Sequence, residues 1–270
     1  DRILKLMLPA LFGVSVTQIN LLLNTIWASF MQDGSVSWLY SAERMTELPL
    51  GLIGVAIGTV ILPSLSARHA EQDQAKFKSM IDWAAKIIML VGIPASIALF
   101  MLSTRIIQAL FQRGEFTLED TRMTALALQC MSAGVISFML IKVFAPGFYA
   151  QQDTKTPVRV GLMAVAANAI LNVVFIGLFK LIDWHAEHMA LAMASSGSAL
   201  VNAGMLYFYL HKRNIYRFGA HWKKLALQYT VANITMIAAL WYGLTWYQGD
   251  ISQWLRIVEV TGLCVIGVIA

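Results

Sequence analysis

SAERMTELPLGLIGVAIGTVILP, residues 41–63, is the stretch that decides the fold class. Its charged side chains, Glu43, Arg44 and Glu47, stand near the start, and no further charge follows before Pro63. A helix that crosses a bilayer needs about 20 mostly apolar residues, and only helices and closed barrels satisfy their backbone groups in lipid. The apolar run is longer than the roughly ten residues of a barrel strand, so the stretch predicts a transmembrane helix.

Apolar stretches recur along the whole chain of 270 residues, of which 58% are hydrophobic and 13% are charged. Soluble domains carry about 25% charged residues, so the composition excludes an ordinary soluble protein. The net charge of +5 forms no basic patch interleaved with aromatic residues, and we expect no nucleic-acid partner. We expect an all-α polytopic membrane helix bundle with about eight transmembrane helices, at residues 3–31, 36–66, 80–104, 122–150, 158–182, 188–211, 223–247 and 252–270.

Lysine and arginine are unevenly distributed between the loops that join these helices. Cytoplasmic loops of membrane proteins carry an excess of both residues, and here the bases gather in alternate loops, so we expect the N-terminal end of the segment in the cytoplasm. The polar loop 67–79 is expected to be either a short amphipathic surface helix or a solvated linker. The bases assigned to the cytoplasmic side are Arg2, Lys5, Arg68, Lys76, Lys78, Lys155, Arg159, Lys212, Arg213, Arg217, Lys223 and Lys224.

Arg44 and Glu47 lie inside a predicted span, three residues apart and therefore on one helix face. A charge in the membrane costs about 2.5–3.5 kcal/mol on insertion scales, and it is retained where it faces a cavity or a partner. One interpretation is a structural ion pair that staples helices together. The other is a cavity-lining cation for an anionic substrate, because the planar guanidinium suits phosphate oxygens. Lys142 in the fourth span is a further charged candidate, unless its long side chain reaches the interface.

Amide side chains form a second polar group within the predicted spans. Gln18, Asn20 and Asn24 lie in the first span, and Asn168 and Asn172 lie in the fifth. Such groups join transmembrane helices through hydrogen bonds worth about 0.6 kcal/mol on average, or they line a polar cavity. Their presence on different spans favours an internal cavity.

Proline and glycine interrupt the span that contains Arg44. Pro49 is followed by Gly51, Gly54 and Gly58. Proline is tolerated in membrane helices where neighbouring groups satisfy the freed carbonyl, and glycines four residues apart allow close helix contact. The pattern predicts a span that packs closely against a neighbour and can bend.

Sequence signatures of enzymes and resident metals are absent from the chain. It contains no HExxH, GxSxG, Walker A or CxxC motif. His185 and His188 lie close together, but no further ligand cluster accompanies them. We therefore expect no enzyme activity, no catalytic residues, no metal site and no cofactor.

Three segments resemble the MviN/MurJ family of lipid II flippases, which belongs to the multidrug/oligosaccharidyl-lipid/polysaccharide exporter superfamily. The resemblance extends over essentially the whole chain; the second segment is the most specific, and the QDTKTP motif in the third is shared more loosely. The segments are LMLPALFGVSVTQINLLLNTIWASF (6–30), SVSWLYSAERMTELPLGLIGVAIGTVILPSLS (35–66) and YAQQDTKTPVRVG (149–161).

This resemblance implies a fold and an activity. The family has fourteen spans in two lobes, so residues 1–215 are expected to form a six-helix C-terminal lobe. Residues 216–270 are expected to form two additional helices with a groove for a lipid tail. The implied activity moves lipid II, the undecaprenyl-pyrophosphate-linked peptidoglycan precursor, to the outer leaflet of the bacterial inner membrane by alternating access, for cell-wall synthesis. The implied partners are lipid II, membrane lipids and an N-terminal lobe outside this sequence.

The resemblance also implies roles for individual residues. Arg44 is the cavity arginine expected to meet the pyrophosphate, and Glu47 is its acidic companion. Some members hold sodium at positions that correspond to Asn24, Asn168 and Asn172. Asparagines stand here where such sites use acidic residues, and hard cations favour carboxylate oxygens, so we expect no sodium coupling. The alternatives are a related multidrug or polysaccharide-lipid exporter and, more remotely, a non-transporting membrane scaffold.

Overall fold

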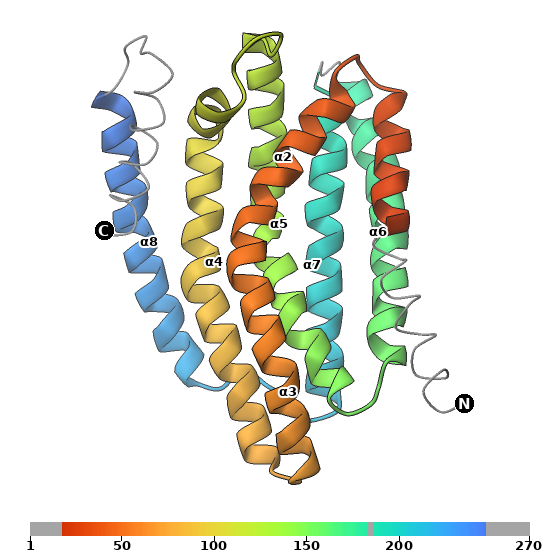
Figure 1. Cartoon of the computed structure of the whole chain (residues 1–270), viewed down its shortest axis with the longest axis vertical. Helices are drawn as coiled ribbons and strands as arrows, with labels where there is room; N and C mark the ends of the chain where they lie inside the picture. The colour runs from red at the N-terminus through yellow and green to blue at the C-terminus, as the bar shows by residue number, and fades with distance from the viewer. Residues whose placement is uncertain (1–17, 183–185, 247–270) are drawn as a thin grey trace.

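Every secondary-structure element in the described part of the chain is a helix (Figure 1). The computed structural model describes residues 18–182 and 186–246. Residues 18–29 are helical. The remaining elements are α2 (Ser35–Pro49), the π-helix η1 (Leu50–Val55), α3 (Ala56–Ala70), α4 (Gln74–Leu110), α5 (Leu118–Tyr149), α6 (Lys155–Leu181), α7 (His188–Lys212) and α8 (His221–Trp246).

Six of these helices are long and apolar enough to cross a membrane. They are Ser35–Ala70, which joins α2, η1 and α3 into one continuous span, together with α4, α5, α6, α7 and α8. The predictions of spans at 36–66, 80–104, 122–150, 158–182, 188–211 and 223–247 are therefore confirmed. Helical residues 18–29 belong to the first predicted span, and the eighth, at 252–270, lies outside the described residues.

The prediction for the loop 67–79 is wrong in both of its forms. The helix α3 continues to Ala70, and α4 already begins at Gln74, so only a tight turn separates them. Gln72 adopts a positive φ of 56° in this turn. The Asp73 side chain accepts a hydrogen bond from the backbone N–H of Lys76 at 3.0 Å and so caps α4. The polar residues of the loop thus belong to the ends of two long helices.

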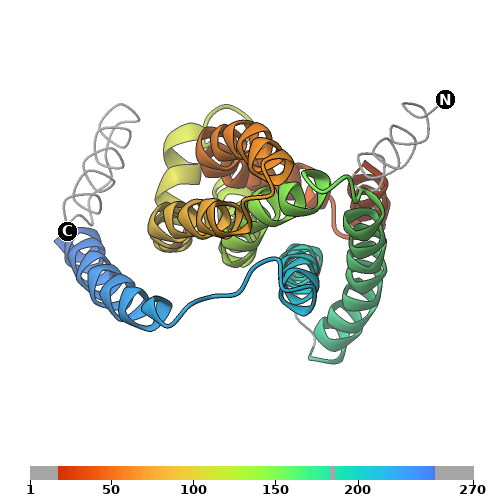
Figure 2. The same ribbon diagram turned by 90° about the horizontal axis from the view of Figure 1, so that it is seen from below.

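The central helix of the bundle is α5, which packs against α4, α7, α2 and α3. Seen from below, α5 and α7 lie between α8 on one side and α6 on the other (Figure 2). The largest cluster of buried apolar side chains joins α3, α4, α5 and α7 and includes Ile61, Phe77, Ile81, Met139, Phe144 and Leu210.

The closest approach between α5 and α7 occurs at Gly134. A Cβ atom built on this glycine would lie 2.9 Å from Cα of Ser196, closer than real side chains pack. The absence of a side chain lets the two backbones meet, which is how small residues serve membrane helix contacts. The Ser196 hydroxyl donates to the carbonyl of Cys130 at 2.8 Å, which ties the helices together beside the contact.

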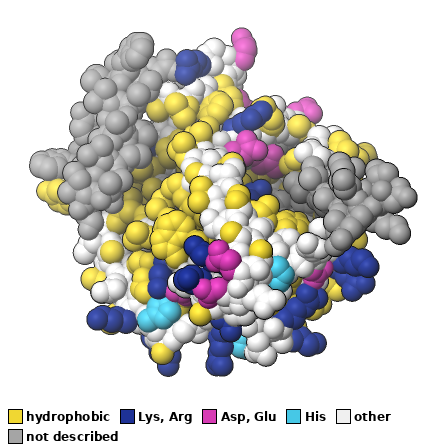
Figure 3. Space-filling model, turned by 60° about the horizontal axis from the view of Figure 1, so that its bottom comes forward, with side chains coloured by type: hydrophobic (Ala, Val, Ile, Leu, Met, Phe, Trp, Pro, Cys, Tyr) yellow, Lys and Arg dark blue, Asp and Glu magenta, His cyan; other side chains and the backbone are white. Residues whose placement is uncertain are grey.

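One end of the bundle carries most of the bases that the sequence assigns to the cytoplasm. The α3–α4 turn, the α5–α6 connection and the α7–α8 linker all lie at this end, at the bottom of Figure 1. Lysine and arginine side chains gather there when the bottom is turned forward (Figure 3). We call it the basic end, defined by Arg68, Lys76, Lys78, Lys155, Arg159, Lys212, Arg213, Arg217, Lys223 and Lys224. The alternation inferred from the sequence is therefore present in the fold.

The span that contains Arg44 changes its helical form directly after Pro49. Residues Leu50–Val55 form a π-helix between two α-helical segments. Proline lacks the N–H that would complete the α-helical ladder, and single π-helical turns are frequent at functional sites. The proline and glycines therefore mark a local change of helix geometry.

Candidate functional site

Arg44 lies on an exposed face of α2, held by two side chains of the same helix. Its Nε and Nη2 atoms donate to the hydroxyl of Tyr40 at 3.1 and 2.7 Å. The guanidinium also lies 5.0 Å from the centre of the Tyr40 ring. Its Nη1 atom lies 3.4 Å from Oε2 of Glu47. The two predicted site residues are thus brought together, with Tyr40 as a third member that the sequence did not reveal.

These contacts bear on the two interpretations of the pair. Arg44 and Glu47 are 57% and 61% exposed, and an exposed ion pair of this kind contributes about 0–1 kcal/mol. Both partners of Arg44 belong to α2, so within the described residues the pair does not join one helix to another. Tyr40 and Glu47 orient the guanidinium but leave its remaining donors available to an external anion.

A cavity of about 510 Å³ lies between helical residues 18–29, α2, α5 and α7. Tyr40, the partner of Arg44, lines it, whereas Arg44 and Glu47 are not among its lining residues. Glu43 contributes a carboxylate to its wall, and Tyr40 and Ser41 contribute hydroxyls. Asn24 and Ser195 line the cavity from the opposite helices. Sequence analysis placed Glu43 inside the span but gave it no role. The signal available was its position directly before Arg44.

The asparagines of the first and fifth predicted spans meet beside this cavity. Asn172 donates from Nδ2 to Oδ1 of Asn24 at 3.1 Å and to Oδ1 of Asn168 at 3.0 Å. Asn24 donates in turn to the hydroxyl of Ser195 on α7 at 3.0 Å. All four side chains are buried. The structure therefore joins three helices through amides.

The other two predicted cavity residues do not join this cluster. Gln18 is exposed and Asn20 is half-buried, and neither makes a hydrogen bond to Asn24, Asn168 or Asn172. Asn20 lies one turn before Asn24 on the same helix face, with its Oδ1 atom buried and without a partner among the described residues, whereas Gln18 lies on a different face.

The asparagine cluster does not fit the sodium site that the family resemblance implies. A hard cation needs several oxygen ligands, preferably carboxylates. Here the Oδ1 atoms of Asn24 and Asn168 already accept from Asn172, Oδ1 of Asn172 is the one amide oxygen of the three left without a partner, and every member is neutral. Within the described residues no three His, Cys, Asp or Glu side chains are grouped together. The cluster therefore contributes hydrogen bonds between helices, and no step is assigned to a metal.

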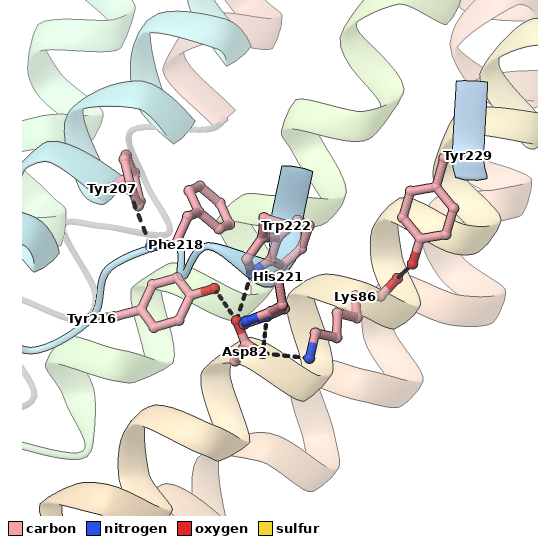
Figure 4. Close-up of polar contacts among 8 residues, drawn as sticks. All are labelled: Asp82, Lys86, Tyr207, Tyr216, Phe218, His221, Trp222 and Tyr229. Carbon is pink, nitrogen blue, oxygen red and sulfur yellow. Dashed lines mark hydrogen bonds and ion pairs between the residues drawn. The ribbon is translucent and has the colours of Figure 1, made fainter. Parts of the chain in front are cut away.

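A second polar constellation, missed by sequence analysis, lies near the basic end around Asp82 of α4 (Figure 4). Tyr216 and the indole N–H of Trp222 donate to Oδ1 at 2.8 and 2.7 Å. Lys86 and His221 contact Oδ2 at 2.7 and 3.1 Å. Burial and the neighbouring carboxylate raise the pKa of Tyr216, so its hydroxyl stays protonated and donates.

This constellation attaches the start of α8 to the rest of the bundle. Tyr216, just before α8, is buried and Phe218 stacks on Tyr207 with ring centres 4.6 Å apart. The segment between α7 and α8 is thus a packed connection. The family resemblance implies a boundary between residues 215 and 216. The partners of Asp82, one before α8 and two in its first turn, were visible only in three dimensions.

Three features characterise the described part of the chain. It has long apolar spans, an exposed arginine on one of them, and a buried polar cluster between three helices. The chain forms a multi-pass helical membrane protein, with six helices long and apolar enough to cross a membrane among its described residues. The chain belongs to the lipid II flippase MurJ family, whose model matches residues 1–258.

Two curated relatives illustrate the match. The probable lipid II flippase MurJ of Vibrio cholerae is 43% identical over 99% of this chain and 50% of its own length. That of Haemophilus influenzae is 44% identical over 94% of this chain and 49% of its own length. The chain therefore spans about half the length of the curated relatives it matches.

Two solved structures share the fold. A lipid II flippase MurJ in an inward closed conformation has a TM-score of 0.77 at 24% identity, over 98% of this chain and 52% of that one. An outward-facing multidrug resistance transporter of the MATE family has a TM-score of 0.65 at 15% identity, over 89% and 54%. The all-helical transporter fold expected from the sequence is confirmed.

Proposed function

We propose that the protein containing this chain moves lipid II from the inner to the outer leaflet of the bacterial cytoplasmic membrane, for peptidoglycan synthesis. The curated relatives that cover nearly all of this chain are named as lipid II flippases. The likeness to a multidrug transporter extends only to the fold, at 15% identity, so the related-exporter alternative has no separate support. The activity is transport, with no covalent step for the protein to catalyse.

The observation that carries this proposal is the exposed guanidinium of Arg44 inside an apolar span. A pyrophosphate cannot cross hydrocarbon without compensation of its charge. Arginine donates in a planar fork that matches phosphate oxygens. Glu47 and Tyr40 hold this fork in one orientation through contacts of 3.4 and 2.7 Å. Arg44 therefore binds the anionic headgroup, and Glu47 positions the guanidinium of Arg44.

The remaining polar residues support the same activity. Asn24 lines the cavity beside Arg44's helix, and its hydrogen bonds to Asn172 and Ser195 hold the wall of this lobe in shape. Gln18 and Asn20, on the same helix as Asn24, are available to a headgroup as weaker polar contacts. Asn168 accepts a hydrogen bond from Asn172 and so helps to hold Asn172 in place.

The parts of the protein have separate tasks in this proposal. Residues 1–215 form one lobe, and an N-terminal lobe outside this sequence completes a central cavity that opens alternately to the two sides. Residues 216–270 add two helices whose groove holds the polyprenyl tail in lipid. The basic end faces the cytoplasm because short cytoplasmic loops carry excess lysine and arginine, which also puts the N-terminal end of this segment inside.

Complementation tests the role of Arg44 in the full-length protein. In bacteria depleted of their own lipid II flippase, Arg44→Ala should fail to support growth at a membrane abundance equal to wild type. Arg44→Lys keeps the charge but not the fork and should support growth partially. The matched control is Arg68→Ala, which breaks another arginine–glutamate pair three residues apart, at the C-terminal end of the same span and at the basic end.

The outcomes separate the candidate functions. Growth with Arg44→Ala would overturn the proposal that this arginine binds the headgroup. Loss of the protein from the membrane would instead support the scaffold interpretation, in which the charges hold the fold together. Failure of the wild-type protein to complement would favour a different cargo.

A further inference from the structure

Lys142 is a charged residue of the central helix α5 that the site described above does not use. It is exposed, although α5 is the most buried of the six spans. Lys142 makes no hydrogen bond or ion pair with another described residue. A charge without a partner inside a membrane helix is retained where it reaches water or a ligand.

The face on which Lys142 lies differs from a lipid-facing surface. Between Gly134 and Tyr149, only Lys142 and Tyr149 are exposed, and seven residues separate them, so they share one helix face. The exposed residues of α6, in contrast, are apolar, as lipid contact requires: Leu162, Met163, Ile170, Val173, Val174 and Leu178. On this stretch of α5, exposure is therefore confined to a lysine and a tyrosine, both of which carry a polar group.

This face of α5 runs beside the helix that carries Arg44. The side-chain stem of Lys142 lies next to Gly54 and Gly58, whose Cβ positions would be 3.8 Å from its Cγ and Cβ atoms. The two glycines follow Arg44 by ten and fourteen residues, which corresponds to about 15–20 Å along a helix. Lys142 also lies about 10 Å from the end of α5 at the basic end, by the same rise per residue.

We propose that Lys142 is a second anion-binding residue, which receives a phosphate-bearing lipid headgroup at the basic end before the headgroup reaches Arg44. The proposal rests on the proposed function and adds an entry contact to it. An ammonium on a flexible stem suits a first contact, because it attracts phosphate as a point charge without fixing one geometry. The fork of Arg44 then binds the headgroup in a defined orientation at a greater depth.

The phosphate at Lys142 has two sources, the pyrophosphate of lipid II and the phosphate of ordinary anionic phospholipid. The test uses full-length protein in vesicles of phosphatidylcholine alone, and in vesicles with added phosphatidylglycerol. Binding of lipid II is titrated for wild type, Lys142→Ala and Lys142→Arg. The control is Lys78→Ala, which removes another exposed lysine at the basic end, on α4.

In phosphatidylcholine, Lys142→Ala should weaken lipid II binding about tenfold, the effect of losing one charge-assisted contact. Lys142→Arg and Lys78→Ala should bind as wild type does. If Lys142→Ala weakens binding only in vesicles with phosphatidylglycerol, Lys142 binds the phosphate of ordinary phospholipid. That result would overturn the proposal that it binds the pyrophosphate of lipid II. Unchanged binding in both vesicles would overturn the proposal.

A second measurement does not depend on transport. Lys142→Cys is prepared with Cys130 and Cys264 replaced by serine, and it is treated with a charged, membrane-impermeant maleimide from the side of the basic end. The proposal predicts labelling that lipid II slows. A residue that faces lipid would remain unlabelled and would overturn the proposal. If labelling is slowed while Arg44→Ala transports normally, the role proposed for Arg44 fails and the entry contact at Lys142 stands. If lipid II slows labelling but the wild-type protein does not transport it, the proposed transport of lipid II fails and the binding at Lys142 stands.

Discussion

Replacement of Gly134 by alanine probes the contact between α5 and α7 that supports the site helices. The added Cβ would lie 2.8, 2.9 and 3.0 Å from Oγ, Cα and Cβ of Ser196, whereas ordinary contact begins at 3.4 Å. Because Cα belongs to the backbone, the helices must separate by about 0.5 Å to accept it. Overpacking of this kind costs about 1–3 kcal/mol.

Two further contributions to the free energy of unfolding add to the cost of overpacking or offset it. Separation would lengthen the 2.8 Å hydrogen bond from Ser196 to the carbonyl of Cys130, which contributes about 1 kcal/mol. Alanine also favours the helix over glycine by about 1 kcal/mol. These terms nearly cancel, so Gly134→Ala should destabilise the folded state by about 1–3 kcal/mol.

Thermal unfolding of the full-length protein in detergent measures this effect. The matched control is Gly177→Ala in α6, where the added Cβ would meet no atom within 4 Å. The control should unfold at the wild-type temperature or above it, because only the helix preference changes. Equal unfolding temperatures for the two variants would refute the close contact between α5 and α7.

Three further changes test other parts of the structure. Asp82→Asn should destabilise the protein by about 1–3 kcal/mol, because a charged acceptor is lost, and faster protease cleavage of the α7–α8 connection would report release of α8. Sodium should raise the unfolding temperature of Asn172→Asp, because a carboxylate joins the amide oxygens as a cation ligand. If sodium changes the unfolding temperature of the variant no more than that of wild type, this expectation is wrong. Burial opposes ionisation of Asp153, but bonds from Thr156 and Arg213 outweigh it and keep its pKa below 3.8. Its contribution to stability is therefore present above the unfolded pKa and lost as the pH falls through the lowered pKa. Asp153→Asn should destabilise the protein at pH 7, and the difference from wild type should shrink as unfolding scans are run at progressively lower pH.

The spans could be predicted from the sequence because lipid imposes a local requirement. Apolar length alone locates a membrane helix, and each of the six spans in the described part begins and ends within about seven residues of its prediction. Lipid does not impose this requirement on the helix ends that lie in water, so apolar length does not locate them. The loop 67–79 was mispredicted because its polar residues are compatible with helix, and α3 and α4 simply continue into it.

The site could be predicted only in part. Arg44 and Glu47 were found because charge in an apolar span is conspicuous, and their separation of three residues fixes their contact. The meeting of Asn24 with Asn172 depends on how separate helices pack, which periodicity does not encode. Asp82 was overlooked for the same reason, since its partners Tyr216 and Trp222 lie more than a hundred residues away.

Movement of lipid II in vesicles shows whether Arg44 carries the headgroup across the membrane. Full-length protein is reconstituted in vesicles with headgroup-labelled lipid II, and an impermeant quencher reports how fast the inner-leaflet label reaches the outside. Wild type and Arg68→Ala should expose this label, whereas Arg44→Ala and empty vesicles should not. Exposure by Arg44→Ala at the wild-type rate would show that Arg44 is not needed to carry the headgroup across the membrane.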